Sequence, residues 1–89
     1  MPAMLIADDN EQITKILAKF AQKEGFTADT VYDGAAALAQ FARHPYDILL
    51  LDVMMPKMDG FAVCRTIRQH SNVPIIMITA RGEDYERIM

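Results

Sequence analysis

The sequence predicts an α/β fold built on a doubly wound parallel sheet, and three observations lead to it. Four short apolar runs recur at intervals of about 20 to 27 residues, the spacing of βαβ units. Segments with helical patterning separate these runs. The run Ile48 to Leu51 lacks the alternation of a half-exposed strand, so we expect helices to cover both faces of the sheet.

Composition restricts the chain to one small domain. Its 89 residues are 52% hydrophobic and 24% charged, a balance that excludes an intrinsically disordered protein. The net charge is −3 and the basic residues do not cluster, so we expect this segment to bind neither nucleic acid nor a membrane surface. The single cysteine, Cys64, and the lack of a signal peptide or membrane span predict a cytoplasmic chain.

The first half of the chain predicts two strands separated by a helix. The strand over 4–7 ends at Asp8 and Asp9. A helix over 11–24 follows, because apolar side chains recur there with helical spacing, at Ile13, Ile16, Leu17, Phe20 and Ala21. Either Asp9 or Asn10 can cap its start, and Gly25 is placed to end it. A weaker strand is expected over 26–32.

The second half repeats this alternation. Asp33 and Gly34 precede an alanine-rich helix over 35–43, and the buried strand over 46–51 is closed by Asp52. Asp59 can cap a third helix over 60–70, which buries Cys64. The fourth strand is expected over 73–78, with a further helix beginning in 83–89.

Polar residues collect at the carboxyl ends of three predicted strands, where ligands bind in open α/β sheets. Asp8 and Asp9 follow the first strand, Asp52 the third and Thr79 the fourth. Two carboxylates about 5 Å apart repel by roughly 3 kcal/mol at an effective dielectric of 20. Such crowding favours a bound cation or a retained proton, and oxygen ligands with open water positions suit Mg²⁺.

The structural alternative is that each aspartate only forms a turn or caps a helix, which is the usual role of an aspartate after a strand. Asp9 and Asp59 fit helix caps. Asp52 does not, because Val53 to Pro56 separate it from the next helix. Acids and a hydroxyl at the same edge of one sheet therefore favour a site.

Three segments resemble the signature blocks of bacterial response-regulator receiver domains. They are 5–10, 50–60 and 76–80, in the family's order and with its spacing along the whole chain. The resemblance implies a flavodoxin-like receiver fold with strand order 2-1-3-4-5. It also implies a phosphoacceptor module of two-component or phosphorelay signalling, which is not a conventional enzyme and at most catalyses its own phosphotransfer and autodephosphorylation.

The resemblance implies a role for each site residue. Asp52 would accept a phosphoryl group from a phosphohistidine of a sensor histidine kinase and would also bind Mg²⁺. Asp9 would bind Mg²⁺ directly and Asp8 through water, and the backbone carbonyl of Met54 would supply another ligand. Thr79 would place its switch hydroxyl on a phosphoryl oxygen. Ala80 beside it would be small enough to leave room.

The chain departs from the family pattern because it ends before the fifth strand. The family's phosphoryl-contacting lysine follows that strand, and Lys57, in the loop after the third strand, cannot take its role. We therefore expect one domain over 1–89, truncated within its fourth helix, that binds Mg²⁺ weakly and is phosphorylated poorly. An output domain, commonly a DNA-binding transcription domain in this family, would lie outside this segment.

The missing unit also predicts self-association. With this strand order, residues 73–78 form an edge strand, and the sheet face beside the first helix is uncovered. An apolar edge strand promotes association, through pairing or exchange of elements with a copy. The alternative function is thus a receiver-like dimerisation module that is not phosphorylated. A nucleotide-binding flavodoxin-like protein is less favoured, since no glycine-rich loop follows the first strand.

Overall fold

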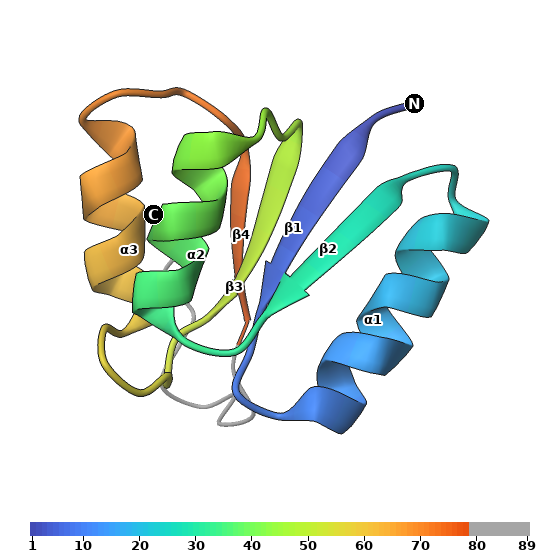
Figure 1. Ribbon diagram of the computed structural model, residues 1–89, viewed down its shortest axis with the longest axis horizontal. Helices are drawn as coiled ribbons and strands as arrows, with labels where there is room; N and C mark the ends of the chain where they lie inside the picture. The colour runs from blue at the N-terminus through green and yellow to red at the C-terminus, as the bar shows by residue number, and fades with distance from the viewer. Residues whose placement is uncertain (79–89) are drawn as a thin grey trace.

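The computed structural model describes residues 1–78, which form a parallel sheet flanked by helices (Figure 1). Its elements are β1 (Ala3–Ala7), α1 (Glu11–Lys23), β2 (Thr27–Val31), α2 (Gly34–Arg43), β3 (Ile48–Asp52), α3 (Gly60–Arg68) and β4 (Ile75–Ile78). All seven elements predicted within this range are present, with ends that differ by about two residues at most. The helix expected over 83–89 lies outside the described residues.

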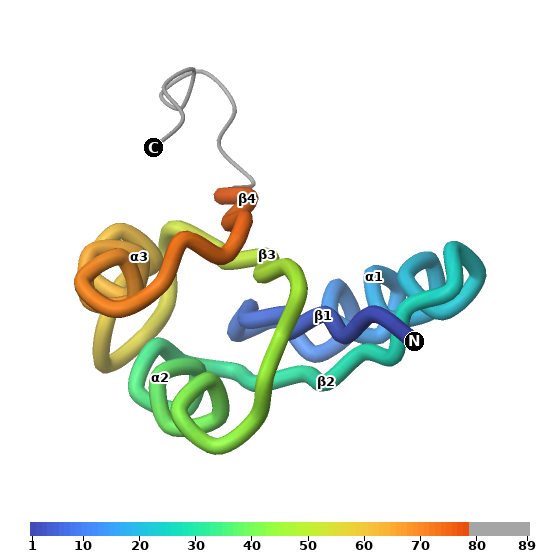
Figure 2. Tube along the Cα trace, turned by 90° about the horizontal axis from the view of Figure 1, so that it is seen from above, coloured from blue at the N-terminus to red at the C-terminus, as the bar shows by residue number. Residues whose placement is uncertain are grey.

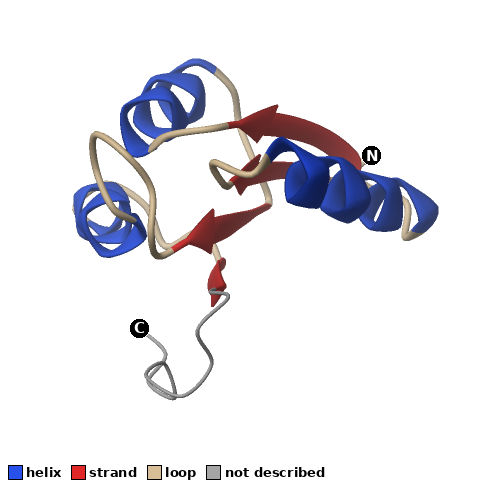
Figure 3. Ribbon diagram, turned by 90° about the horizontal axis from the view of Figure 1, so that it is seen from below, coloured by secondary structure: helices blue, strands red, loops and turns tan. Residues whose placement is uncertain are grey.

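The four strands are parallel and lie in the order β2-β1-β3-β4. Helix α1 lies on one face of the sheet, and α2 and α3 lie on the other (Figures 2 and 3). The predicted fold class and the order of these strands are therefore confirmed. Because β1 and β3 are parallel neighbours, their carboxyl ends meet at the same edge of the sheet.

Alternate side chains of the central strands divide the core into two layers. Leu5 and Leu49 are fully buried against α2 and α3, in a cluster that also contains Cys64. On the other face, Ile6 is fully buried and packs in a second cluster with Ala21 of α1. The continuous apolar pattern of the strands is explained by this coverage on both sides, and the prediction that Cys64 is a core residue is confirmed.

A polar residue caps the start of each helix. The Asn10 side-chain oxygen accepts hydrogen bonds from the backbone N–H groups of Gln12 (2.9 Å) and Ile13 (3.1 Å). Of the two caps considered for α1, Asn10 is therefore correct and Asp9 is not. Asp33 and Asp59 cap α2 and α3 in the same way. The carboxylate of Asp9 is therefore not used to cap α1.

The apolar stripe predicted for α1 is only partly covered. Ala21 is buried, whereas Ile16 is 55% exposed and Phe20 is 61% exposed. On the same side of the sheet, Ile76 of β4 is 47% exposed, because no helix among residues 1–78 lies beside α1 on this face. Among residues 1–78, the sheet face on the α1 side is therefore partly exposed.

None of the helices in residues 1–78 combines the length and the apolar character that crossing a bilayer requires.

Candidate functional site

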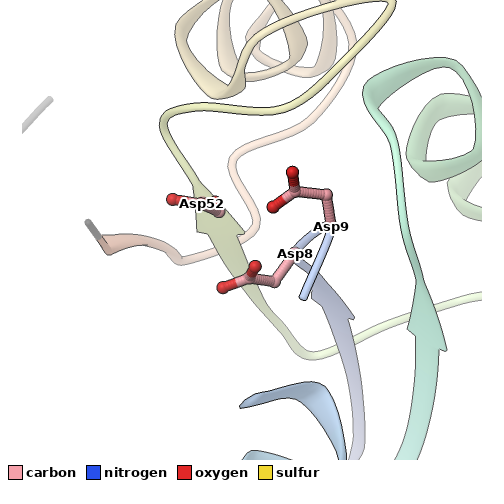
Figure 4. A group of neighbouring side chains, drawn as sticks. All are labelled: Asp8, Asp9 and Asp52. Carbon is pink, nitrogen blue, oxygen red and sulfur yellow. The ribbon is translucent and has the colours of Figure 1, made fainter. Parts of the chain in front are cut away.

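Three carboxylates meet at the carboxyl edge of the sheet. Ala7 of β1 pairs with Leu51 of β3. Asp8 and Asp52, the residues that follow this pair, therefore lie beside one another. One oxygen from each of Asp8, Asp9 and Asp52 lies within 4.8 Å of the others (Figure 4). The predicted gathering of acidic side chains from the first and third strands is therefore confirmed.

The two strand-end aspartates are buried, and backbone groups orient them. Asp8 is 5% exposed and its Oδ1 accepts a hydrogen bond from the Asn10 N–H at 2.9 Å. Asp52 is 8% exposed and its Oδ1 accepts a long hydrogen bond from the Met54 N–H at 3.4 Å. Asp9 is exposed. The site is thus a shallow one, with solvent access on the side of Asp9.

Burial and mutual repulsion make the ionised cluster costly. Desolvation is the larger cause that raises the pKa of Asp52 to about 6, and the negative charge of Asp8 adds to it. Desolvation also raises the pKa of Asp8, although its hydrogen bond from Asn10 opposes the shift. At neutral pH the cluster therefore carries closely spaced negative charge that a cation or a proton would stabilise.

The chemistry of the donors fits a hard divalent cation. The three ligands are carboxylates, and neither histidine nor cysteine belongs to the cluster found among residues 1–78. Carboxylate oxygens with water completing the coordination are typical of Mg²⁺, whereas a structural zinc site would use sulfur or nitrogen ligands. The acidic triad is able to hold a metal ion of this class.

The loop that follows Asp52 is closed by a glycine. The Gly60 N–H donates a hydrogen bond to the Val53 carbonyl at 2.9 Å. A Cβ atom at Gly60 would overlap the Asp52 carbonyl oxygen, so the loop can return to the strand end only because residue 60 has no side chain. The start of α3 therefore packs directly on the backbone of Asp52.

Two predicted site residues, Thr79 and Ala80, lie outside the described residues. The end of β4 is placed, however, because the Val53 N–H donates a hydrogen bond to the Ile78 carbonyl at 2.9 Å. The chain therefore reaches position 78 directly beside the residue that follows Asp52.

Sequence reasoning missed a contact between the loop after β3 and the start of α2. The sequence places Lys57 in the loop after the third strand and Gly34 before a helix, and no local pattern links the two residues. Lys57 is exposed, but its Nζ lies 3.8 Å from Asp33 Oδ2. The Met-Pro-Lys-Met-Asp-Gly segment gives a turn signal, and no local pattern shows that the turn packs on α2.

The comparisons with known proteins agree with this geometry. Residues 4–89 match the response regulator receiver domain family. Among curated relatives, the sensory transduction protein RegX3 of Mycobacterium tuberculosis is 46% identical over 89 residues, and the transcriptional regulatory protein CpxR homolog of Haemophilus influenzae is 43% identical over the same length. All of this chain is covered in both cases, but it spans only 39% of each relative.

Solved structures show the same fold. The chemotaxis protein CheY4 of Vibrio cholerae superimposes with a TM-score of 0.87 at 31% identity, covering 94% of this chain and 72% of that one. The response regulator TrrA of Thermotoga maritima, solved with Mg²⁺ and BeF, gives a TM-score of 0.87 at 35% identity and covers 92% and 72%. These ligands belong to the TrrA structure, to which this chain is similar.

Membership in the family explains the acidic cluster, which is typical of the phosphorylation site of such domains. Domains of this family are not conventional enzymes. On the match over 4–89, the shared fold and the carboxylates of Asp8, Asp9 and Asp52, this chain belongs to the response regulator receiver domain family.

Proposed function

We propose that this chain is a phosphoacceptor that takes a phosphoryl group onto Asp52 from a phosphohistidine of a sensor histidine kinase. The observation that carries the proposal is the buried Asp52 carboxylate at the end of β3, within 4.8 Å of carboxylate oxygens of Asp8 and Asp9. The exposed Asp9 gives solvent access to one side of the site. We further propose that residues 1–89 belong to a single receiver domain.

The chemistry is one displacement at phosphorus. A carboxylate oxygen of Asp52 forms a bond to phosphorus as the phosphorus–nitrogen bond of phosphohistidine breaks, and the electron pair of that bond returns to the imidazole nitrogen. Phosphoryl transfer depends mainly on positioning and on neutralising charge. A bound Mg²⁺ supplies that neutralisation, and the resulting acyl phosphate is labile enough for a reversible signal.

We propose the remaining roles from the resemblance to the family, and the arrangement around Asp52 supports those of the acidic residues. Asp9 would bind Mg²⁺ directly, Asp8 would bind it through water, and the backbone carbonyl of Met54 would provide a further ligand beside Asp52. The support for Met54 is its N–H bond to Asp52, which fixes residue 54 next to the nucleophile. Thr79 and Ala80 take the switch-hydroxyl and small-neighbour roles, one and two residues after the end of β4.

The partners proposed for the whole protein follow from its relatives. A sensor histidine kinase supplies the phosphoryl group. An output domain outside this segment carries the response. By analogy with the transcriptional regulatory protein named above, this output domain binds DNA and the response is transcription. The segment itself binds neither nucleic acid nor membrane. A cytoplasmic location suits both the kinase partner and the free Cys64 thiol.

Phosphorylation of Asp52 is the direct test. With acetyl phosphate and Mg²⁺, we expect the mass of the chain to increase by one phosphoryl group, in a slow reaction that EDTA prevents. Asp52→Asn should abolish the increase, because an amide is not a comparable nucleophile. Labelling that persists in Asp52→Asn would contradict the assignment, and no labelling at all would favour the unphosphorylated interaction module.

Metal binding is tested at Asp9. We expect Mg²⁺ to raise the thermal unfolding midpoint of the chain, since a ligand that binds only the folded state stabilises it. Asp9→Asn should weaken Mg²⁺ binding on the order of tenfold or more, because it removes a charged ligand. Calorimetric titration and thermal unfolding followed by circular dichroism measure both effects.

Asp47→Asn is the matched control for the variant at Asp9. Residue 47 precedes β3, at the other end of the sheet, and an asparagine there can still accept the hydrogen bond that the Ala3 N–H donates to Asp47 at 2.7 Å. The same charge is removed without touching the site. Equal losses of Mg²⁺ affinity in the two variants would show that net charge, and not a ligand, explains the result.

The raised pKa of Asp52 predicts how stability depends on pH without metal. The folded state holds a proton that the unfolded chain releases above its pKa of 3.8, so folding stability falls as pH rises from about 4 to about 6. Asp52→Asn removes this loss. In EDTA, we expect the variant to be more stable by on the order of 1–2 kcal/mol near pH 7.5, with the gain fading towards pH 4. A urea titration series would refute this if the gain were independent of pH.

Self-association is proposed through the β4 edge. Among residues 1–78, β4 pairs only with β3, and Ile76 on it is 47% exposed on the face of the sheet that α1 partly covers. An unpaired apolar edge favours pairing with a second copy or exchange of elements. We expect sedimentation velocity at tens of micromolar to show a dimer or larger species, which Ile76→Lys should weaken. A stable monomer at that concentration would refute the proposal.

A further inference from the structure

The loop between β3 and α3 contains a strained turn at Lys57. The Met58 N–H donates a hydrogen bond to the Pro56 carbonyl at 2.8 Å, which encloses Lys57 in a three-residue γ-turn. The φ angle of Lys57 is 71°, and it is the one non-glycine residue with a positive φ among those described. γ-Turns with positive φ are rare because they are strained, so surrounding contacts must hold this one in place.

The first of these contacts is with Gly34, the first residue of α2. Its N–H donates a long hydrogen bond to the Pro56 carbonyl at 3.4 Å. A Cβ atom at Gly34 would overlap the Met58 carbonyl oxygen and lie 2.7 Å from the Met58 carbonyl carbon. The turn therefore rests directly on the backbone of α2, at a distance that only glycine permits.

The second contact is an ion pair between Lys57 and Asp33. The two charged atoms are 3.8 Å apart, and the other oxygen of Asp33 accepts the capping hydrogen bond from the Ala36 N–H at 2.7 Å. The Lys57 side chain is 69% exposed, so the ion pair alone contributes little. Together with Gly34, however, it fixes the middle of the loop to the start of α2.

The ends of the loop are fixed to the site itself. Gly60 packs on the Asp52 carbonyl and hydrogen-bonds to Val53, as described above. Met54 lies within this closed segment, with its N–H directed at Asp52. A loop held at both ends and in its middle has little freedom, and any displacement of the turn at Lys57 must be absorbed by the few residues between it and Asp52.

We propose that Gly34 and the γ-turn at Lys57 are positioning elements for the metal site: by seating the β3–α3 loop on α2, they hold the backbone of Met54 where its carbonyl can serve as a ligand. Gly34 and Lys57 both lie outside the carboxylate cluster. This inference rests on the proposed function, since it assumes that Met54 and the carboxylates bind Mg²⁺. It adds the junction between β2 and α2 to the parts of the chain on which the proposed metal affinity depends.

Two substitutions at Lys57 separate the turn from the ion pair. Lys57→Gly removes the ammonium group but favours a positive φ, whereas Lys57→Val removes the same group and opposes a positive φ through its β-branch. Both variants lose the contact with Asp33 equally. We expect both to fold, because the side chain of Lys57 is exposed. We expect Lys57→Val to weaken Mg²⁺ binding on the order of tenfold, and Lys57→Gly to bind within about twofold of the original chain.

Gly34→Ala tests the seat of the turn on α2. Alanine is favourable within a helix, so this change should not harm α2 itself, but its Cβ must displace Met58. Ala35→Ser is the matched control, because it adds one atom at the neighbouring position, which is exposed. We expect weaker Mg²⁺ binding in Gly34→Ala and unchanged binding in Ala35→Ser.

The readout is Mg²⁺ titration of ¹⁵N-labelled chain followed by backbone amide resonances, with circular dichroism as the check on folding. The Met54 amide should shift in the metal-free Gly34→Ala and Lys57→Val variants, which a general loss of stability would not produce. If the original chain does not bind Mg²⁺, the proposed metal site fails. If it binds and both Lys57 variants bind equally, or if folded Gly34→Ala binds normally, the positioning proposal is overturned.

Discussion

The parallel pairing of β1 with β3 is the constraint on which the rest of the structure depends. It places the residues after Ala7 and Leu51 at one edge, and therefore forces Asp8 and Asp52 together despite their charges. Both carboxyl groups are buried and both have raised pKa values, with desolvation as the main cause. Burial of the apolar strands offsets this repulsion, because the sheet cannot form without bringing the two carboxylates together.

The same pairing explains why the site is small yet well defined. Leu5 and Leu49 anchor the strands on the α2 and α3 side, and Ile6 anchors β1 on the α1 side. With the strands fixed from both faces, the carboxylates that follow them have little freedom to move apart. The helix caps contribute as well: because Asn10 caps α1, the carboxylate of Asp9 is directed to the cluster (Figure 4).

Two glycines allow the loop after β3 to approach the backbone of other elements closely. Gly60 packs on the carbonyl of Asp52, and Gly34 packs on that of Met58. The turn at Lys57 lies between these contacts and takes a conformation that residues with side chains rarely adopt. The proposed link between metal binding and loop geometry thus depends on backbone contacts, and not on charged or nucleophilic side chains.

Apolar periodicity and strand-end polarity are local patterns, so they were enough to predict the fold class, the alternation of elements and the acidic residues at the strand ends. The sequence left open whether Asp9 or Asn10 caps α1, and it did not show how far the stripe containing Phe20 is exposed. It also gave no sign that Lys57 contacts Asp33 or that Gly34 contacts Met58. These features depend on how separate segments pack against one another, and only the tertiary structure decides that.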